Sequence, residues 1–237
     1  MAASGLDSIA RGVARAASIL AFAAVPAAAA PAAGDGYTYR VSNMYNNEVW
    51  GKADYRVERI EAGRVVIAFA TDVLALGAAR TEVYTDDGNG LALALINHDR
   101  PVAYEFASPL PAYQFPLDPG KSWSMRVGAV NAQTGKRVNV RVDGDVAGTE
   151  RISTPAGSFD TIRIKRSIYA GDWDGFRFET NIVETEWYAP ALGRAVRLER
   201  NSSYFDQQRC SDEMSACRPA RGDWVRYELT EARTAQQ

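Results

Sequence analysis

Residues 137–143 read RVNVRVD, a stretch in which Val138, Val140 and Val142 alternate with polar residues. A period of two is typical of a β-strand with one apolar and one solvated face, because successive side chains of a strand point to opposite sides. Such strands belong to antiparallel sheets, since the strands of parallel sheets are buried on both faces and are apolar throughout. This segment therefore predicts an antiparallel, all-β protein.

The same alternation recurs along the chain after residue 36. It is found in residues 37–41, 65–69, 91–95, 123–127, 162–164, 176–178, 196–198 and 225–229. Turn-forming clusters such as DDGNG and DPG separate these stretches, and the spacing predicts roughly ten to twelve strands in a meander. A sheet of this size must cover its apolar face, so we expect a curled half-barrel or incomplete β-barrel able to hold an apolar cavity.

The N-terminal stretch has the composition of a secretory signal peptide. Arg11 and Arg15 precede an apolar, alanine-rich run at residues 16–33 that ends in small residues. We expect residues 1–32 to be cleaved and residues 33–237 to form a single β-rich domain that is periplasmic or secreted. A membrane anchor is the weaker alternative, because two prolines interrupt the run, and no other segment is apolar enough to span a membrane as a helix.

Composition excludes several classes of function. The 237 residues include 27 basic and 29 acidic side chains, one His and two Cys. This balance lacks the basic surface that nucleic-acid binding needs, and the few His and Cys residues cannot complete a structural zinc site. No nucleotide or hydrolase motif is present, and His98 lies in a polar turn where we expect it at the surface. We therefore expect no cofactor, no metal, no catalytic residue and no enzymatic activity.

The two cysteines are close together in the sequence. Cys210 and Cys217 enclose the polar segment SDEMSA. In an exported protein a pair this close most simply forms a disulfide, and the spacing differs from the C-x-x-C of redox proteins. We expect the bond to hold a long turn near the last strands.

Two carboxylates raise a separate question. Glu184 and Glu186 continue the face of the strand that carries Ile182. Either a β-bulge near Ile182 turns both carboxylates into solvent, or both point into the barrel. In the second case their spacing overlaps that of an inverting glycosidase, although two residues of one strand would approach a sugar from the same side.

Aromatic residues supply candidates for a ligand pocket. Trp123, Phe178 and Trp187 lie in expected strands and could line a cavity. The alternative is that they are ordinary core residues, which is the usual role of aromatic side chains in sheets.

Three segments resemble a known group of proteins. They are PGKSW at residues 119–123, TPAGSFDTIRI at 154–164 and EWYAPALGRAVR at 186–197. Their combination resembles TapB-like and related bacterial envelope proteins of unknown function, although no lipid-anchor Cys follows the apolar run. The resemblance implies export and a curved antiparallel sheet, and it transfers no functional residue.

These observations leave three hypotheses about function. The first is an exported, non-enzymatic protein that binds an apolar small molecule, a lipid or another amphipathic ligand, or that assists envelope assembly. The second is an interaction module whose edge strands or solvated face bind another envelope protein. The third is a hydrolase that uses Glu184 and Glu186.

Overall fold

Twelve β-strands make up most of the computed structural model, which describes residues 29–171, 176–209 and 217–235. The strands are β1 (Gly36–Asn43), β2 (Val49–Glu61), β3 (Arg64–Thr71), β4 (Arg80–Thr85), β5 (Gly90–Asn97), β6 (Arg100–Leu110), β7 (Ser122–Asn131), β8 (Arg137–Thr154), β9 (Gly157–Gly171), β10 (Arg177–Ala189), β11 (Arg194–Asp206) and β12 (Ala220–Arg233). Three 3-10 turns accompany them: η1 (Leu74–Leu76), η2 (Pro190–Leu192) and η3 (Gln207–Arg209). Among the described residues, no helix is long and apolar enough to cross a membrane.

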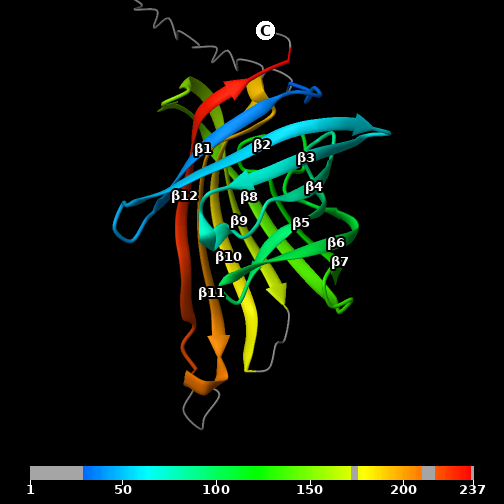
Figure 1. Ribbon diagram of the computed structural model, residues 1–237, viewed down its shortest axis with the longest axis vertical. Helices are drawn as coiled ribbons and strands as arrows, with labels where there is room; N and C mark the ends of the chain where they lie inside the picture. The colour runs from blue at the N-terminus through cyan, green and yellow to red at the C-terminus, as the bar shows by residue number, and fades with distance from the viewer. Residues whose placement is uncertain (1–28, 172–175, 210–216, 236–237) are drawn as a thin grey trace, which may run out of the picture.

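The strands form one closed antiparallel barrel. Each strand pairs with its neighbours in the chain, and β1 pairs with both β2 and β12, as Figure 1 shows. Gly36 lies opposite Arg56 on one side and Arg233 on the other. The antiparallel barrel expected from the alternation is confirmed, and the sheet goes beyond the expected half-barrel or incomplete barrel because its two ends meet. Closure pairs the backbone groups that free edge strands would expose.

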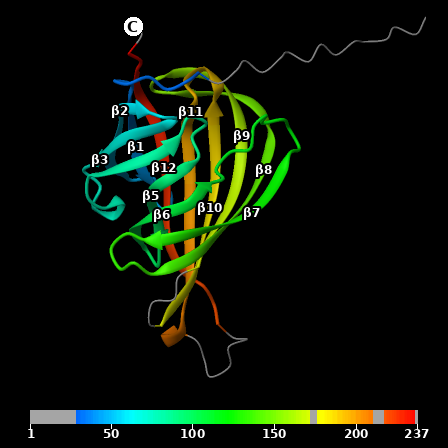
Figure 2. The same cartoon turned by 90° about the vertical axis from the view of Figure 1, so that its right-hand side faces the viewer.

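The hairpin formed by β5 and β6 is attached to the barrel wall along short ladders. The two strands pair with each other at seven positions, whereas β4 and β5 pair at two and β6 and β7 at three. Figure 2 shows this hairpin crossing the wall in front of the long strands β9 to β11. Few backbone hydrogen bonds therefore hold the hairpin to the strands on either side.

The tip of this hairpin is tied to β10 and β11 by polar contacts. The backbone N–H of His98 donates to Oγ1 of Thr180 at 2.9 Å, and that hydroxyl donates to Oδ1 of Asn97 at 3.2 Å. The Tyr204 hydroxyl donates to the Asp99 carboxylate at 3.1 Å. His98 is only 1% exposed, so the expectation of a surface histidine is wrong: the polar turn folds back onto the barrel wall.

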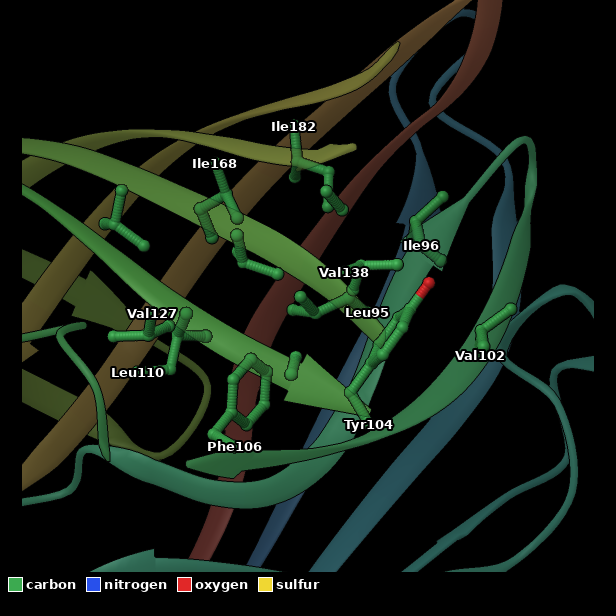
Figure 3. Close-up of a cluster of buried hydrophobic side chains, with 14 residues drawn as sticks. Leu95, Ile96, Val102, Tyr104, Phe106, Leu110, Val127, Val138, Ile168 and Ile182 are labelled. Carbon is green, nitrogen blue, oxygen red and sulfur yellow. The ribbon is translucent and has the colours of Figure 1, made fainter. Parts of the chain in front are cut away.

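An apolar cluster fills the space between the hairpin and strands β7 to β10 (Figure 3). It includes Val140 and Val142 from the stretch quoted first, Leu95 and Tyr104 from the hairpin, and Ile168 from β9. Full burial of such a side chain stabilises the fold by roughly 1.5–3 kcal/mol. The cluster therefore fixes the hairpin against the opposite wall and closes off this part of the interior.

Residues 111–121 connect β6 to β7, and η1 lies between β3 and β4. Residues 1–28 of the predicted signal peptide and Cys210 lie outside the described residues. The cleavage and the disulfide between Cys210 and Cys217 therefore stay predictions.

Candidate functional site

A cavity of about 220 Å³ lies inside the barrel, bordered by residues from strands on all sides. Val57, Val65 and Ile67 form a contiguous apolar cluster on one wall, and Leu93 and Leu95 of the hairpin add to it. The remaining wall carries charged and phenolic side chains. The cavity is therefore amphipathic, because apolar and charged side chains line the same space.

Glu184 is placed between two arginines by the register of three neighbouring strands. It lies opposite Arg166 on β9 and opposite Arg200 on β11. Its Oε2 accepts from Nε of Arg166 at 3.1 Å and from Nη2 at 2.9 Å, and its Oε1 accepts from Nε of Arg200 at 2.7 Å. Opposite charges at paired positions stabilise a sheet, and here they also satisfy both oxygens of a buried carboxylate.

Glu186 completes the same network one inward position further along β10. It forms an ion pair with Arg166, and its Oε1 accepts from the Tyr113 hydroxyl at 2.6 Å. Glu184 and Glu186 are 4% and 2% exposed, so the inward alternative holds for both. The face does not switch near Ile182, because the irregularity in pairing with β11 falls between Phe178 and Asn181.

The electrostatic setting keeps Glu184 ionised. Burial by itself would raise the pKa of Glu184, but the Arg200 and Arg166 guanidiniums together hold it below its usual value. Both arginines have a raised pKa despite burial, because Glu186 and Glu184 favour the charged form of Arg166 and Glu184 favours that of Arg200. A carboxylate held in this way is a counter-charge, whereas a general acid would need a raised pKa.

Arg194 is the third arginine of the cavity, and its surroundings differ from those of the other two. The guanidinium lies 4.3 Å from the centroid of the Tyr37 ring, 5.0 Å from that of Tyr55 and 5.9 Å from that of Tyr39. Its Nε is buried and has no hydrogen-bond partner in the described part of the chain. Burial works to lower the pKa of Arg194, but the neighbouring tyrosines raise it above the usual value, so the side chain stays charged.

A further buried ion pair lies beside the cavity on β4. The Glu82 carboxylate accepts from Nε of Arg80 at 2.7 Å and from the Tyr84 hydroxyl at 2.5 Å. The Arg80 guanidinium in turn lies 3.8 Å from the centroid of the Phe69 ring. The two charges of this pair cancel, so the pair does not change the net charge of the groups that line the cavity.

The three aromatic residues considered as pocket candidates lie away from the cavity lining. Trp123 packs against Gly144 and donates from Nε1 to the Pro111 carbonyl at 3.0 Å. Phe178 stacks on the neighbouring Phe205 with ring centroids 5.4 Å apart. Trp187 alternates with the inward Glu186 and donates to Glu150 at 2.9 Å. Each thus has a packing or hydrogen-bonding partner of its own.

The sequence interpretation missed the arginines, although the pattern contains a signal for them. Arg166 stands between Ile164 and Ile168 at an inward position, and Arg200 follows Val196 and Leu198 with the same parity. A charged residue at an apolar position of an alternating strand indicates a buried ion pair or a site. The tyrosines of the cavity also place a polar group at inward positions of strands, and they give the same indication.

Together, the fold and the cavity define a closed antiparallel β-barrel whose interior contains an amphipathic cavity with buried ion pairs. The fold is shared with a candidate exported protein with a YmcC-like fold from Bacteroides fragilis, which is 17% identical with a TM-score of 0.52 over 86% of this chain and 98% of that chain. At this identity the match shows the fold alone.

Two further solved structures are similar at lower scores. A candidate lipoprotein from Parabacteroides distasonis is 14% identical with a TM-score of 0.49, covering 86% of this chain and 97% of that chain. The hypothetical lipoprotein YmcC from Escherichia coli is 12% identical with a TM-score of 0.42, covering 84% of each chain. No protein-family model matches this chain, and the comparison with curated proteins finds no match. The resemblance to TapB-like proteins therefore rests on the sequence motifs.

Proposed function

We propose that this chain is an exported, non-enzymatic protein that binds one small amphipathic ligand inside its barrel. The observation that carries the proposal is the cavity of about 220 Å³ inside the barrel, which is lined by an apolar surface and by charged and phenolic side chains. Ligand sites for drug-sized molecules usually measure about 300–1,000 Å³ and combine apolar lining with a few placed polar groups. The smaller volume favours a compact ligand over a two-chain lipid.

The location outside the cytoplasm is supported by two observations. Residues 1–32 have the composition of a signal peptide. The structure from Bacteroides fragilis with the same fold is described as a candidate exported protein. We therefore place the protein in the periplasm or outside the cell, where a carrier of small molecules or a factor for envelope assembly would act.

The absence of catalysis is supported by the arrangement of the two carboxylates. Glu184 is held between Arg166 and Arg200, and Glu186 is bonded to Arg166 and Tyr113. Both acids lie on one strand, and the remaining acid of the cavity lining, Asp86, is exposed to solvent. This geometry favours a structural and electrostatic role over the hydrolase hypothesis.

The interaction-module hypothesis is weakened by closure of the sheet. Binding by strand addition needs an edge with unpaired backbone groups. In the described barrel every strand has a neighbour on both sides, although β5 pairs with β4 at only two positions and β6 pairs with β7 at only three. A partner would have to use the outer face of the barrel or these partly paired strands.

The proposal is tested by native mass spectrometry of the protein purified from its host after expression of the full coding sequence. We expect a reproducible excess mass that organic solvent removes and that identifies the ligand. The excess should disappear in Val65→Phe, which fills the apolar wall, and should remain in Ala70→Phe, where the same ring is added at an exposed position of β3. Equal occupancy in both folded variants would contradict binding in the cavity.

A further inference from the structure

The charges that line the cavity are unevenly paired. Three guanidiniums, of Arg166, Arg194 and Arg200, border it together with the two buried carboxylates of Glu184 and Glu186. The two carboxylates are bonded to Arg166 and Arg200. The interior therefore holds one cation more than its buried anions neutralise.

That surplus cation is Arg194. In the described part of the chain no carboxylate lies within ion-pair distance of it, and its buried Nε has no hydrogen-bond partner. Asp35 lies near Tyr37, but its two oxygens accept from the backbone N–H groups of Ala32 and Ala235. Asp86, the remaining acid of the lining, is exposed to solvent at the rim. Solvent and salt screen such a charge strongly.

The position of Arg194 is fixed by the chain around it. Gly193 adopts a left-handed conformation, with φ of 63°, that ends η2, and Arg194 begins β11 directly after it. The rings of Tyr37, Tyr55 and Tyr39 surround the guanidinium, while the residue as a whole keeps part of its surface exposed to the cavity. Aromatic rings contact the face of a guanidinium, and the N–H groups in its plane are the donors that bind planar anions.

A buried or half-buried charge is stable when an opposite charge reaches it, and a carboxylate matches the fork of an arginine. We propose that the cavity binds a small organic acid, with its carboxylate on Arg194 and its apolar body against Val57, Val65 and Ile67. This inference rests on the proposed function and specifies the chemical class of the ligand. Arg166 and Arg200 are already paired with carboxylates, which leaves Arg194 as the cation available to a ligand anion.

The test uses three probes with one chain length and different head groups: octanoate, 1-octanol and octylammonium. Binding to the exported protein is measured by titration calorimetry after removal of co-purified ligand. We expect octanoate to bind at least about tenfold more tightly than 1-octanol, and octylammonium to bind most weakly. Equal binding of octanoate and 1-octanol would overturn the head-group assignment and leave the cavity function standing, whereas no binding of any probe would overturn the cavity function itself.

Variants at Arg194 test whether the carboxylate of the ligand binds to that side chain. In Arg194→Gln we expect octanoate affinity to fall at least about tenfold while 1-octanol affinity is unchanged, and in Arg194→Lys we expect a smaller loss. Arg197→Gln is the matched control, because Arg197 lies on the same strand but bonds to Glu228 outside the cavity lining. Unchanged octanoate binding in folded Arg194→Gln would overturn the proposal. If that variant does not fold, the comparison of the three probes on the unaltered protein decides it.

Discussion

The indole of Trp123 on β7 lies against the backbone of Gly144, its direct partner on β8. A Cβ atom added at Gly144 would lie 2.2 Å from Cζ2 of the ring. The tryptophan thus occupies the space above a residue without a side chain, inside the barrel but outside the cavity lining. This contact explains why an aromatic residue in an inward position contributes to the core and leaves the cavity open.

We predict that Gly144→Ala destabilises the protein by about 1–3 kcal/mol, because a methyl group would displace a packed indole. Gly128→Ala is the matched control on β7: an added Cβ would lie 3.8 Å from Ala107, an ordinary contact. Chemical denaturation followed by tryptophan fluorescence measures both. Equal stability of the two variants would show that the indole moves aside at no cost.

We predict that Glu184→Gln lowers the free energy of unfolding by about 3–5 kcal/mol, because the buried Arg166 and the half-buried Arg200 lose a shared counter-charge. The control is Asp160→Asn, which breaks the exposed ion pair with Arg151, whose side chains are 67% and 83% exposed. That change should cost no more than about 1 kcal/mol. Similar losses in both variants would argue against a special role for the buried network.

The lowered pKa of Glu184 also predicts that the stability of the protein falls in acid. Because the pKa is lower in the folded protein than in the unfolded chain, its contribution is present above the unfolded value of about 4.3 and is lost as the pH falls below it. Unfolding free energies measured from neutral pH downward should therefore fall less steeply for Glu184→Gln than for the unaltered protein. Parallel curves for the two proteins would contradict this assignment.

The pKa values of the tyrosines predict that the stability of the protein also depends on pH in the alkaline range. Burial is the main cause of a raised pKa at seven of the eleven tyrosines, and it raises that of Tyr37 to about 12. Their stabilising contribution is complete below the unfolded value of about 10 and is lost as the pH rises above it. Titration of phenolate absorbance should show only a minority of tyrosines ionising before the barrel unfolds. Complete ionisation near pH 10 with circular dichroism unchanged would refute the prediction.

We predict that Thr180→Val loosens the β5–β6 hairpin. The substitution removes the partner of the His98 backbone N–H and of Asn97, and a buried group left without its hydrogen bond costs about 1–3 kcal/mol. Hydrogen exchange of residues 90–110 should accelerate by about tenfold or more, ahead of the rest of the barrel.

Thr161→Val provides the control for this experiment. Thr161 is equally buried and donates to the Glu150 carbonyl at 2.6 Å, away from the hairpin. Loss of this hydrogen bond should lower the global stability without a selective acceleration of hydrogen exchange in residues 90–110. Selective exchange in both variants, or in neither, would show that the contacts at the hairpin tip do not hold it.

The alternating pattern identified most of the sheet because most strands have one face in the interior. It did not mark the short strand β4, nor β2, where only Ala53 and Val57 are buried among charged residues, nor β6, which contains Pro101 at its second position. A proline near the start of a strand is tolerated, but it argues against a strand when the sequence is read alone. Closure depends on pairing between β1 and β12, which are far apart in the sequence and have no pattern of their own that specifies it.

The cavity was harder to predict than the sheet. The inward direction of Glu184 was one of two alternatives, and its neighbours Arg166 and Arg200 become visible only when the register of three strands is known. A shift of one residue would have turned every side chain of β10 to the other face. The tyrosines around Arg194 come from β1 and β2, and the sequence contains no local signal for that meeting.

The residues before β1 lie at the rim of the cavity. The backbone N–H of Ala29 donates to the Pro190 carbonyl at 2.8 Å, and Pro31 is part of the cavity lining. Cleavage after Ala32, the site the sequence favours, would carry both residues away with the signal peptide. Cleavage would therefore remove part of the cavity lining, so that the mature protein would have a wider entrance to the cavity than its precursor.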